Sequence, residues 1–348
     1  MSMQAGTESV SELDLPPVAA PGSAGRGPRL TGGRLVARAA PLAVPWLMLA
    51  ALIAAYSSLQ EGVLSREQLN LWTAATLTLL LVAAGQTIVI LLGGIDLSVG
   101  GIVSLSTALA ATQLGTGGSR LIGWAALIAL LGFAAGAVNG FLVARLRLQP
   151  FIVTLATWSI WSGVALWVLP TEGGTVPESY LSWVNREALG IGAPVAVLLA
   201  LVAFWIWFKR TPLGTGIRAI GSSENSAYLS GVPTSLTVTA AYALSGLFAA
   251  LAGLFLVTQT ASGSPTVGND FILNSVAAVV IGGTSLFGGR GGLGGTIAGA
   301  FVLTVIGDLI FALDISSFWT PITTGVLLIL AVLANSLTEL YARRRARR

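Results

Sequence analysis

An aspartate in a glycine-rich break is the residue of this sequence with the clearest potential for chemistry. Asp96 lies in the stretch GGIDLSVGG, Gly93 to Gly101, between two strongly apolar runs. A carboxylate at such a place is costly unless it is paired or hydrated, and it is a candidate for the mouth of a translocation route. The order Asp96, Leu97, Ser98 is also typical of a helix start, where the aspartate caps the helix that follows. The two roles are compatible, and both stay open at this point.

A second acid, Asp308, lies well inside the apolar run 293–313. Together with Asp96 it could relay protons, which would favour a secondary carrier that uses the proton gradient. Proton relays usually need a chain of ionisable groups, and the apolar runs hold no matched Lys, Arg, His or further acid. A proton-coupled carrier is therefore the alternative from another functional class, not the main prediction.

Whole classes of enzyme chemistry are excluded by composition. The chain has no Cys and no His, so thiolate or imidazole metal sites, disulfides and Cys or His bases are impossible. Its only lysine, Lys209, is not preceded by the glycine pattern of a phosphate-binding loop. We expect no catalytic residue, metal site or cofactor in this chain, and if ATP drives transport here, another chain must hydrolyse it.

A second glycine-rich segment runs from Ile281 to Gly295 and contains eight glycines in fifteen residues. This density favours a tightly folded cytoplasmic turn or a re-entrant segment, because irregular backbone at membrane depth must be satisfied by protein or water. The segment echoes the first break, with a Gly-Gly pair at the end of one apolar run. Hinge or turn roles are predicted for seven glycines in these two breaks: Gly93, Gly94, Gly100, Gly282, Gly283, Gly288 and Gly289.

Hydrogen-bonding side chains recur within or at the ends of the apolar runs. They could line a path for a neutral, polyhydroxylated solute, or they could only tie helices together. The candidates for the translocation path are Gln86, Asp96, Ser98, Asn139, Asn274 and Thr284. A ridge of Gly132, Gly136 and Gly140 permits two helices to approach closely, either inside the bundle or at a dimer seam.

The longest polar stretch between apolar runs covers residues 209–233. Its Gly and Ser content predicts a compact loop, except that residues 223–229 suit a short amphipathic helix capped by Ser222 or Ser223. A short helix with little else to pack on is a candidate docking element for a partner protein. An ordinary connector is the alternative.

The elements that must position these residues are membrane spans. The sequence is 54% hydrophobic and only 9% charged, whereas a soluble domain has roughly 25% charged residues. We predict an all-α, polytopic bundle of about ten transmembrane helices, some of them short or broken at the glycine-rich motifs. The spans are predicted at 41–59, 70–92, 97–113, 121–144, 150–169, 193–208, 235–258, 271–286, 293–313 and 318–338.

The basic residues predict the orientation and the domain limits. Ten spans that start from a cytoplasmic N-terminus place fifteen of the eighteen Lys and Arg residues inside, which agrees with the excess of positive charge in cytoplasmic loops. Residues 1–39 are expected to form a disordered cytoplasmic tail, 40–338 the permease domain and 339–348 a basic cytoplasmic tail. The excess of basic over acidic residues then suits the anionic inner surface of the lipid bilayer, and no nucleic-acid partner is expected.

The motifs resemble those of a known family, the permease subunits of the ribose, xylose and galactose class of ATP-binding cassette (ABC) sugar importers. The resemblance covers about residues 40–338. It rests on GGIDLSVG at Gly93 to Gly100, PFIVTLAT at Pro150 to Thr157, TPLGTGIRAIGSSENSAYLSGV at Thr211 to Val232, and IGGTSLFGGRGGLGGT at Ile281 to Thr296.

What the resemblance implies is a multi-pass permease of the bacterial cytoplasmic membrane that imports a monosaccharide or similar solute by alternating access. The implied partners are a cytoplasmic ATPase that binds ATP and Mg, an extracytoplasmic sugar-binding protein, and a second permease copy or paralogue. Related ABC permeases for branched-chain amino acids or nucleosides are a further alternative. The resemblance also marks a segment that contacts the ATPase, with Arg218, Gly221, Glu224, Asn225, Leu229 and Gly231.

Overall fold

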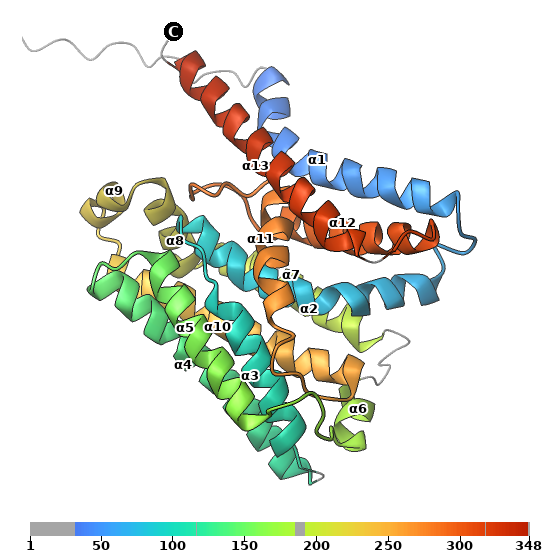
Figure 1. Ribbon diagram of the computed structural model, residues 1–348. Helices are drawn as coiled ribbons and strands as arrows, with labels where there is room; N and C mark the ends of the chain where they lie inside the picture. The colour runs from blue at the N-terminus through green and yellow to red at the C-terminus, as the bar shows by residue number, and fades with distance from the viewer. Residues whose placement is uncertain (1–31, 116, 185–191, 317, 347–348) are drawn as a thin grey trace, which may run out of the picture. The chain divides into compact units, whose positions relative to one another are not determined.

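In the computed structural model, all regular secondary structure of the described residues is α-helical (Figure 1). The structure describes residues 32–115, 117–184, 192–316 and 318–346. The helices are α1 Gly32–Ser57, α2 Arg66–Leu91, α3 Ser98–Gln113, α4 Gly118–Arg145, α5 Pro150–Val168, α6 Glu178–Val184, α7 Ala193–Phe208, α8 Pro212–Ser222, α9 Glu224–Leu229, α10 Thr234–Thr260, α11 Asn269–Ile281, α12 Leu293–Ala312 and α13 Trp319–Ala346.

All ten predicted apolar segments coincide with helices, so the all-α, polytopic fold is confirmed. Five of the described helices are long and apolar enough to cross a membrane alone, namely α2, α4, α5, α10 and α12. A sixth span results if α7 and α8, which meet at an angle of 72°, are counted as one broken span. Shorter apolar helices cover residues 43–57, 269–281 and 319–333, and the total of ten spans stays a prediction.

The chain divides into residues 1–39 and a compact unit of residues 40–348. Residues 1–31 of the expected disordered tail lie outside the described residues, and α1 already begins at Gly32. At the other end, α13 continues as far as Ala346.

Two helices, α2 and α10, form the centre of the compact unit. The second half of α2 is apolar on all sides and buried almost without interruption from Thr76 to Leu91, as expected of a helix that is surrounded by others. The glycine ridge of α4 packs on α10, where Gly132 and Gly136 touch the backbone of Gly246 and Tyr242. The close packing that the ridge predicts is thus found inside the bundle.

The outer faces of α4 and α5 are apolar as well. Ile122 and Leu130 of α4 and Ile152 and Ile160 of α5 are each more than half exposed. An apolar surface of this extent is unusual on a soluble monomer. It suits the hydrocarbon of a bilayer, which confirms the membrane character of the chain.

The α8–α9 pair and α6 lie at opposite ends of the bundle (Figure 1). Gly216 of α8 lies beside Thr237 near the start of α10, whereas the Tyr180 hydroxyl of α6 donates to the carbonyl of Leu254, 3.0 Å away. Thr237 and Leu254 are seventeen positions apart on α10, which corresponds to about 25 Å. Burial raises the pKa of Tyr180 to about 12, so its hydroxyl keeps the proton that it donates.

The compact loop predicted for residues 209–222 is wrong, because α8 occupies Pro212–Ser222. Thr211 caps this helix by accepting a hydrogen bond from Gly214 N at 3.1 Å, and Pro212 suits the first turn. Leu213, Ile217 and Ile220 recur at helical spacing and turn one face towards the bundle. This apolar face outweighs the low helix propensity of the glycines.

Candidate translocation and coupling site

The two glycine-rich breaks end their helices with the same backbone turn. After α2, Gly93 N donates to the carbonyl three residues back at 2.8 Å, and Gly94 N to the carbonyl five residues back at 3.1 Å. After α11, Gly283 N and Thr284 N repeat this pattern at 2.9 and 3.2 Å. The first residue of each pair has a φ near +80°, which only glycine adopts without strain. The two breaks therefore resemble each other in backbone geometry as well as in sequence.

Three segments that are far apart in the sequence meet backbone to backbone at this end of the bundle. Gly289 N donates to the carbonyl of Leu91, the last residue of α2, at 2.9 Å. Gly221, near the end of α8, touches the same carbonyl and leaves no room for a Cβ atom. Gly288 in turn lies against the backbone of Gly221 and Gly93. We call this contact of Leu91, Gly93, Gly221, Gly288 and Gly289 the glycine junction.

The backbone of the first break is held by Gln86, which is fully buried on α2. With its amide nitrogen towards the Asp96 carbonyl and its amide oxygen towards the Asp96 N–H, it makes hydrogen bonds of 3.2 and 3.3 Å. Gln86 thereby pairs both main-chain groups of a residue that no helix includes. Such groups must be satisfied when they are buried.

The Asp96 carboxylate is also fully buried, and it links the break to α3 and α4. One oxygen, Oδ1, accepts from the backbone N–H of Ser98 at 3.0 Å and from the Ser98 hydroxyl at 2.6 Å. Asn139 of α4 donates its amide to the same hydroxyl at 2.7 Å. The N-cap position of α3 belongs to Leu97 and not, as predicted, to Asp96, whose side chain instead accepts from the first residue of the helix and forms part of a buried polar cluster.

Two residues of α10, Tyr242 and Ser245, complete this cluster, and neither is among the residues predicted to line the path. The Ser245 hydroxyl lies near the Asp96 carboxylate without completing a hydrogen bond to it. The Tyr242 hydroxyl fills the space where a Cβ of Gly94 would lie. Their spacing of three residues puts both on one face of α10, and a pair of hydroxyls at this spacing in an apolar run was the available signal.

The other two path candidates lie elsewhere. Thr284 is buried in the second break, where its hydroxyl accepts from Gly292 N at 3.2 Å. Asn274 is half-buried on α11, and among the described residues no hydrogen bond joins it to the Asp96 cluster. Four of the six candidates therefore come together, namely Gln86, Asp96, Ser98 and Asn139.

Two of the predicted hinge glycines serve as contact points between helices. Gly100 of α3 lies against Gly268 at the start of α11, and Gly282 lies against Gly295 of α12. Neither site has room for a side chain. These glycines fix the distance between neighbouring helices next to the two breaks.

The predicted coupling residues lie on and around α8 and α9. Ser223 caps α9 by accepting from Ser226 N at 3.3 Å, so the predicted short helix is confirmed and Ser223 is the cap. Leu229 is 76% exposed and Asn225 is exposed beside it. Gly231, with φ +82°, reverses the chain after the helix.

Two arginines connect this region with its surroundings. Arg147, between α4 and α5, forms an ion pair of 3.2 Å with Glu224 of α9, and both side chains are exposed. Arg218 of α8 lies next to Gly292 in the second break. The α8–α9 pair is therefore in contact with both breaks and with the α4–α5 connection.

Asp308 has a structural partner. It is half-buried on α12, and its Oδ2 accepts from the indole N–H of Trp72 on α2 at 2.7 Å. Trp72 and Gln86 are fourteen residues apart on α2, which puts Asp308 about 21 Å along the helix from the Asp96 cluster. The two acids are thus neither adjacent nor joined by a described hydrogen bond.

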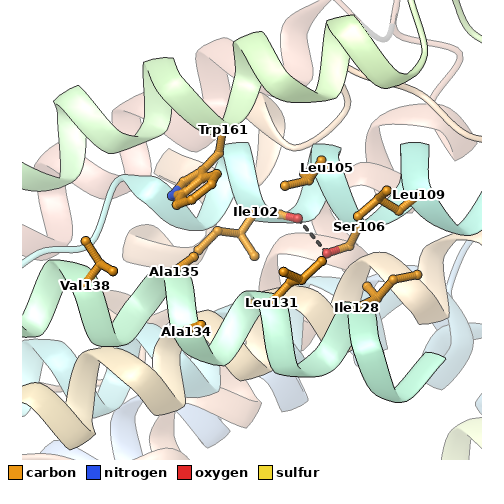
Figure 2. Close-up of a pocket in the computed structure, with 11 residues that line it drawn as sticks. Ile102, Leu105, Ser106, Leu109, Ile128, Leu131, Ala134, Ala135, Val138 and Trp161 are labelled. Atoms are coloured by element: carbon orange, nitrogen blue, oxygen red, sulfur yellow. Dashed lines mark hydrogen bonds between the residues drawn. The ribbon is translucent and has the colours of Figure 1, made fainter. Parts of the chain in front are cut away.

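An apolar pocket opens between α3, α4 and α5 (Figure 2). Ile102, Leu105, Leu109, Ile128, Leu131 and Trp161 form most of its wall. Its one hydroxyl, that of Ser106, already donates to the Ile102 carbonyl at 2.7 Å. A polyhydroxylated solute needs several convergent polar groups, which this pocket lacks.

An all-α bundle with apolar outer faces and several helices long enough to cross a bilayer defines a polytopic membrane protein. The family model described as "Branched-chain amino acid transport system / permease component" matches residues 69–332, and the chain belongs to this family. It is a transport subunit and not an enzyme. The family resemblance that the sequence motifs indicate is thereby confirmed.

Curated relatives carry the same description of a permease. The ribose import permease protein of Escherichia coli K12 is 38% identical over 264 residues, which cover 74% of this chain and 81% of that protein. The D-allose transport system permease protein of the same strain is 33% identical, with coverages of 84% and 90%. The fructose import permease protein of Rhizobium meliloti is 35% identical, with 84% of each chain covered. No solved structure matches the chain.

Proposed function

We propose that this chain is the permease subunit of an ATP-driven importer of a monosaccharide or a similar small polar solute. The relatives named for ribose, allose and fructose support a sugar, although the family description names branched-chain amino acids. The buried groups around the first break, apart from Asp96, are neutral hydrogen-bonding side chains, which suit a hydroxylated, uncharged solute.

The observation that carries the proposal is the glycine junction. It joins the exposed α8–α9 pair directly to the end of α2 and to both breaks, through backbone contacts that contain no flexible side chain. A displacement of α8 is therefore passed to the break that holds Asp96. In an importer of this design, a partner ATPase with bound ATP and Mg docks on α9 and supplies that displacement. The coupling energy comes from contacts that differ between the two states.

The remaining partners are assigned to one end of the bundle and to its outer surface. The extracytoplasmic sugar-binding protein docks at the end that carries α6, opposite the α8–α9 pair. A second permease copy, identical or paralogous, covers part of the apolar outer surface. Both chain termini then lie in the cytoplasm of a bacterial cell, and the spans cross its plasma membrane.

The test is solute-stimulated ATP hydrolysis and uptake in proteoliposomes that contain the permease, its ATPase and its binding protein. Replacing Glu224→Ala together with Leu229→Ala removes an exposed charge and an exposed apolar side chain from α9. We expect stimulated hydrolysis and uptake to fall together at least tenfold, since a partner anchor on this helix is lost. The matched control is Leu64→Ala, which removes another exposed leucine between α1 and α2 and leaves both rates unchanged.

Two outcomes contradict the proposal. Uptake that continues without the ATPase and follows a pH gradient indicates a secondary carrier. Uptake of labelled leucine, with none of ribose, allose or fructose, shows instead that the ABC architecture serves an amino acid.

A further inference from the structure

Four buried oxygen atoms around Asp96 have no hydrogen-bond partner among the described residues. They are Asp96 Oδ2, Asn139 Oδ1, the Tyr242 hydroxyl and the Ser245 hydroxyl. Each of the four residues is at most 1% exposed. Buried polar atoms in folded proteins are nearly always paired, so four orphans in one cluster indicate a further occupant.

The four oxygens come from three elements that meet at one place. Asn139 of α4 is tied to Asp96 through the Ser98 hydroxyl, by hydrogen bonds of 2.7 and 2.6 Å. From α10, Ser245 lies near the carboxylate and Tyr242 lies against Gly94, two residues before Asp96. None of the four oxygens is hydrogen-bonded to another, so a further atom bound in this cluster is needed to pair them.

The chemistry of the orphans selects what that atom is. Asn139 Oδ1 and the free carboxylate oxygen are pure acceptors. A proton on Asp96 would satisfy Oδ2 but leave the amide oxygen alone. A water molecule would serve both acceptors beside a protonated Asp96, whereas a charged Asp96 needs a counter-charge that no described Lys or Arg supplies. A cation supplies both the charge and the bridge.

We propose that Asp96, Asn139, Tyr242 and Ser245 form a binding site for a monovalent alkali cation. All four ligands are hard oxygens, which suit such an ion, and the single carboxylate neutralises one positive charge. A divalent ion would leave an excess charge in a desolvated interior. The bound ion joins the first break to α4 and α10 and stabilises it next to the glycine junction. Ion binding is measured without solute or partner proteins, so its failure is distinguishable from a failure of the proposed sugar import.

Direct ion binding tests the proposal on the purified full-length permease in detergent. Radioactive sodium and rubidium ions serve as probes in a buffer that contains only an organic cation. We expect saturable binding of at least one of the two ions at a single site per chain. Potassium competes for this site more strongly than magnesium does. The thermal unfolding midpoint should also rise with the concentration of the bound ion, because only the folded state has the site.

Variants locate the ion. Asp96→Asn abolishes saturable binding and the ion-dependent stabilisation, whereas Asp308→Asn, at the other acid of the bundle, retains both. Ser245→Ala keeps the volume nearly unchanged and weakens binding about tenfold, as expected for the loss of one ligand. If the Asp96→Asn variant does not fold, the ion affinity of the Ser245→Ala variant tests the proposal instead.

The proposal is overturned if neither ion binds saturably to the wild-type chain. It is also overturned if Asp96→Asn binds as the wild type does, if Ser245→Ala binds with unchanged affinity, or if magnesium is the preferred competitor.

Discussion

Asp96 is accommodated in an apolar bundle because neighbouring polar groups pair its main chain and one of its two carboxylate oxygens. Gln86 pairs its main-chain atoms, Ser98 occupies one carboxylate oxygen, and Asn139 holds Ser98 in place. Each of these side chains has a defined hydrogen bond, so the cluster is positioned with little freedom. These hydrogen bonds hold Asp96 in place relative to α2, α3 and α4.

Asp308, the other acid inside a span, is expected to be structural. Asp308→Asn should leave solute uptake within about twofold of wild type, because a carboxamide oxygen still accepts from the Trp72 indole. Trp72→Phe removes the donor and should lower the free energy of unfolding by about 1–2 kcal/mol. Uptake assays and thermal unfolding in detergent measure the two effects. Loss of uptake in Asp308→Asn would identify a proton relay and contradict the ATP-driven mechanism.

At the scale of single residues, the sequence predicts the members of the Asp96 cluster that stand out as polar groups in apolar runs. Gln86, Asp96, Ser98 and Asn139 were found in this way. Tyr242 and Ser245 were not, because their role depends on the contact of α10 with a break about 150 positions earlier. The sequence pattern around these two residues gives no information on that contact.

At the scale of elements, the packing of α4 on α10 depends on glycines that allow the two backbones to touch. Gly136→Ala places a methyl group against the Tyr242 carbonyl and should cost about 1–3 kcal/mol of stability. Gly163→Ala on α5 meets no atom within 4 Å and should stabilise the chain by up to about 1 kcal/mol. Thermal unfolding of both variants tests these two predictions. A Gly136 variant as stable as the wild type would show that this contact relaxes freely.

The Arg147–Glu224 ion pair connects two elements but is expected to contribute little to folding. Its side chains are 78% and 56% exposed, and exposed pairs stabilise proteins by less than about 1 kcal/mol. Glu224→Gln should therefore shift the thermal unfolding midpoint very little. A large destabilisation would mean that coupling defects in Glu224 variants arise from misfolding.

Elements were predictable where one physical signal dominated. Long apolar runs located all ten predicted helices, and the Gly-Gly pair after α2 located its end, whereas α11 ends at Ile281, before the predicted limit of 286. α8 was not predicted because its glycine and serine content favours a loop, although Leu213, Ile217 and Ile220 recur at helical spacing. Its fold depends on packing against the bundle, which composition does not report.

At the scale of the whole molecule, the orientation in the membrane can be tested directly, because the chain contains no cysteine. Single substitutions Tyr228→Cys on α9 and Ser179→Cys on α6 put thiols at exposed positions on opposite ends of the bundle. A membrane-impermeant maleimide applied to intact spheroplasts should label only Cys at position 179. Inverted vesicles should give the reverse result, as the distribution of basic residues predicts. The opposite labelling pattern would reverse the assignment of both partner proteins.

The meeting of three segments in the glycine junction is a property of the whole fold that no segment reveals alone. Gly221, Leu91 and Gly289 are separated by more than sixty positions in every pairing. Each glycine was singled out by sequence, but their mutual contact required the structure. On this contact rests our proposal that a movement of α8 is passed to the break.

The most direct measurement is therefore ATP-driven solute uptake by Gly221→Ala in proteoliposomes with the ATPase and the binding protein. The matched control is Gly307→Ala, since a methyl group at that position of α12 meets nothing within 4 Å. We predict that the Gly221 variant still hydrolyses ATP but imports solute at least tenfold more slowly, whereas the Gly307 variant equals the wild type. Uptake by the Gly221 variant at the wild-type rate, with the protein folded and assembled, would contradict the transmission of movement through the glycine junction.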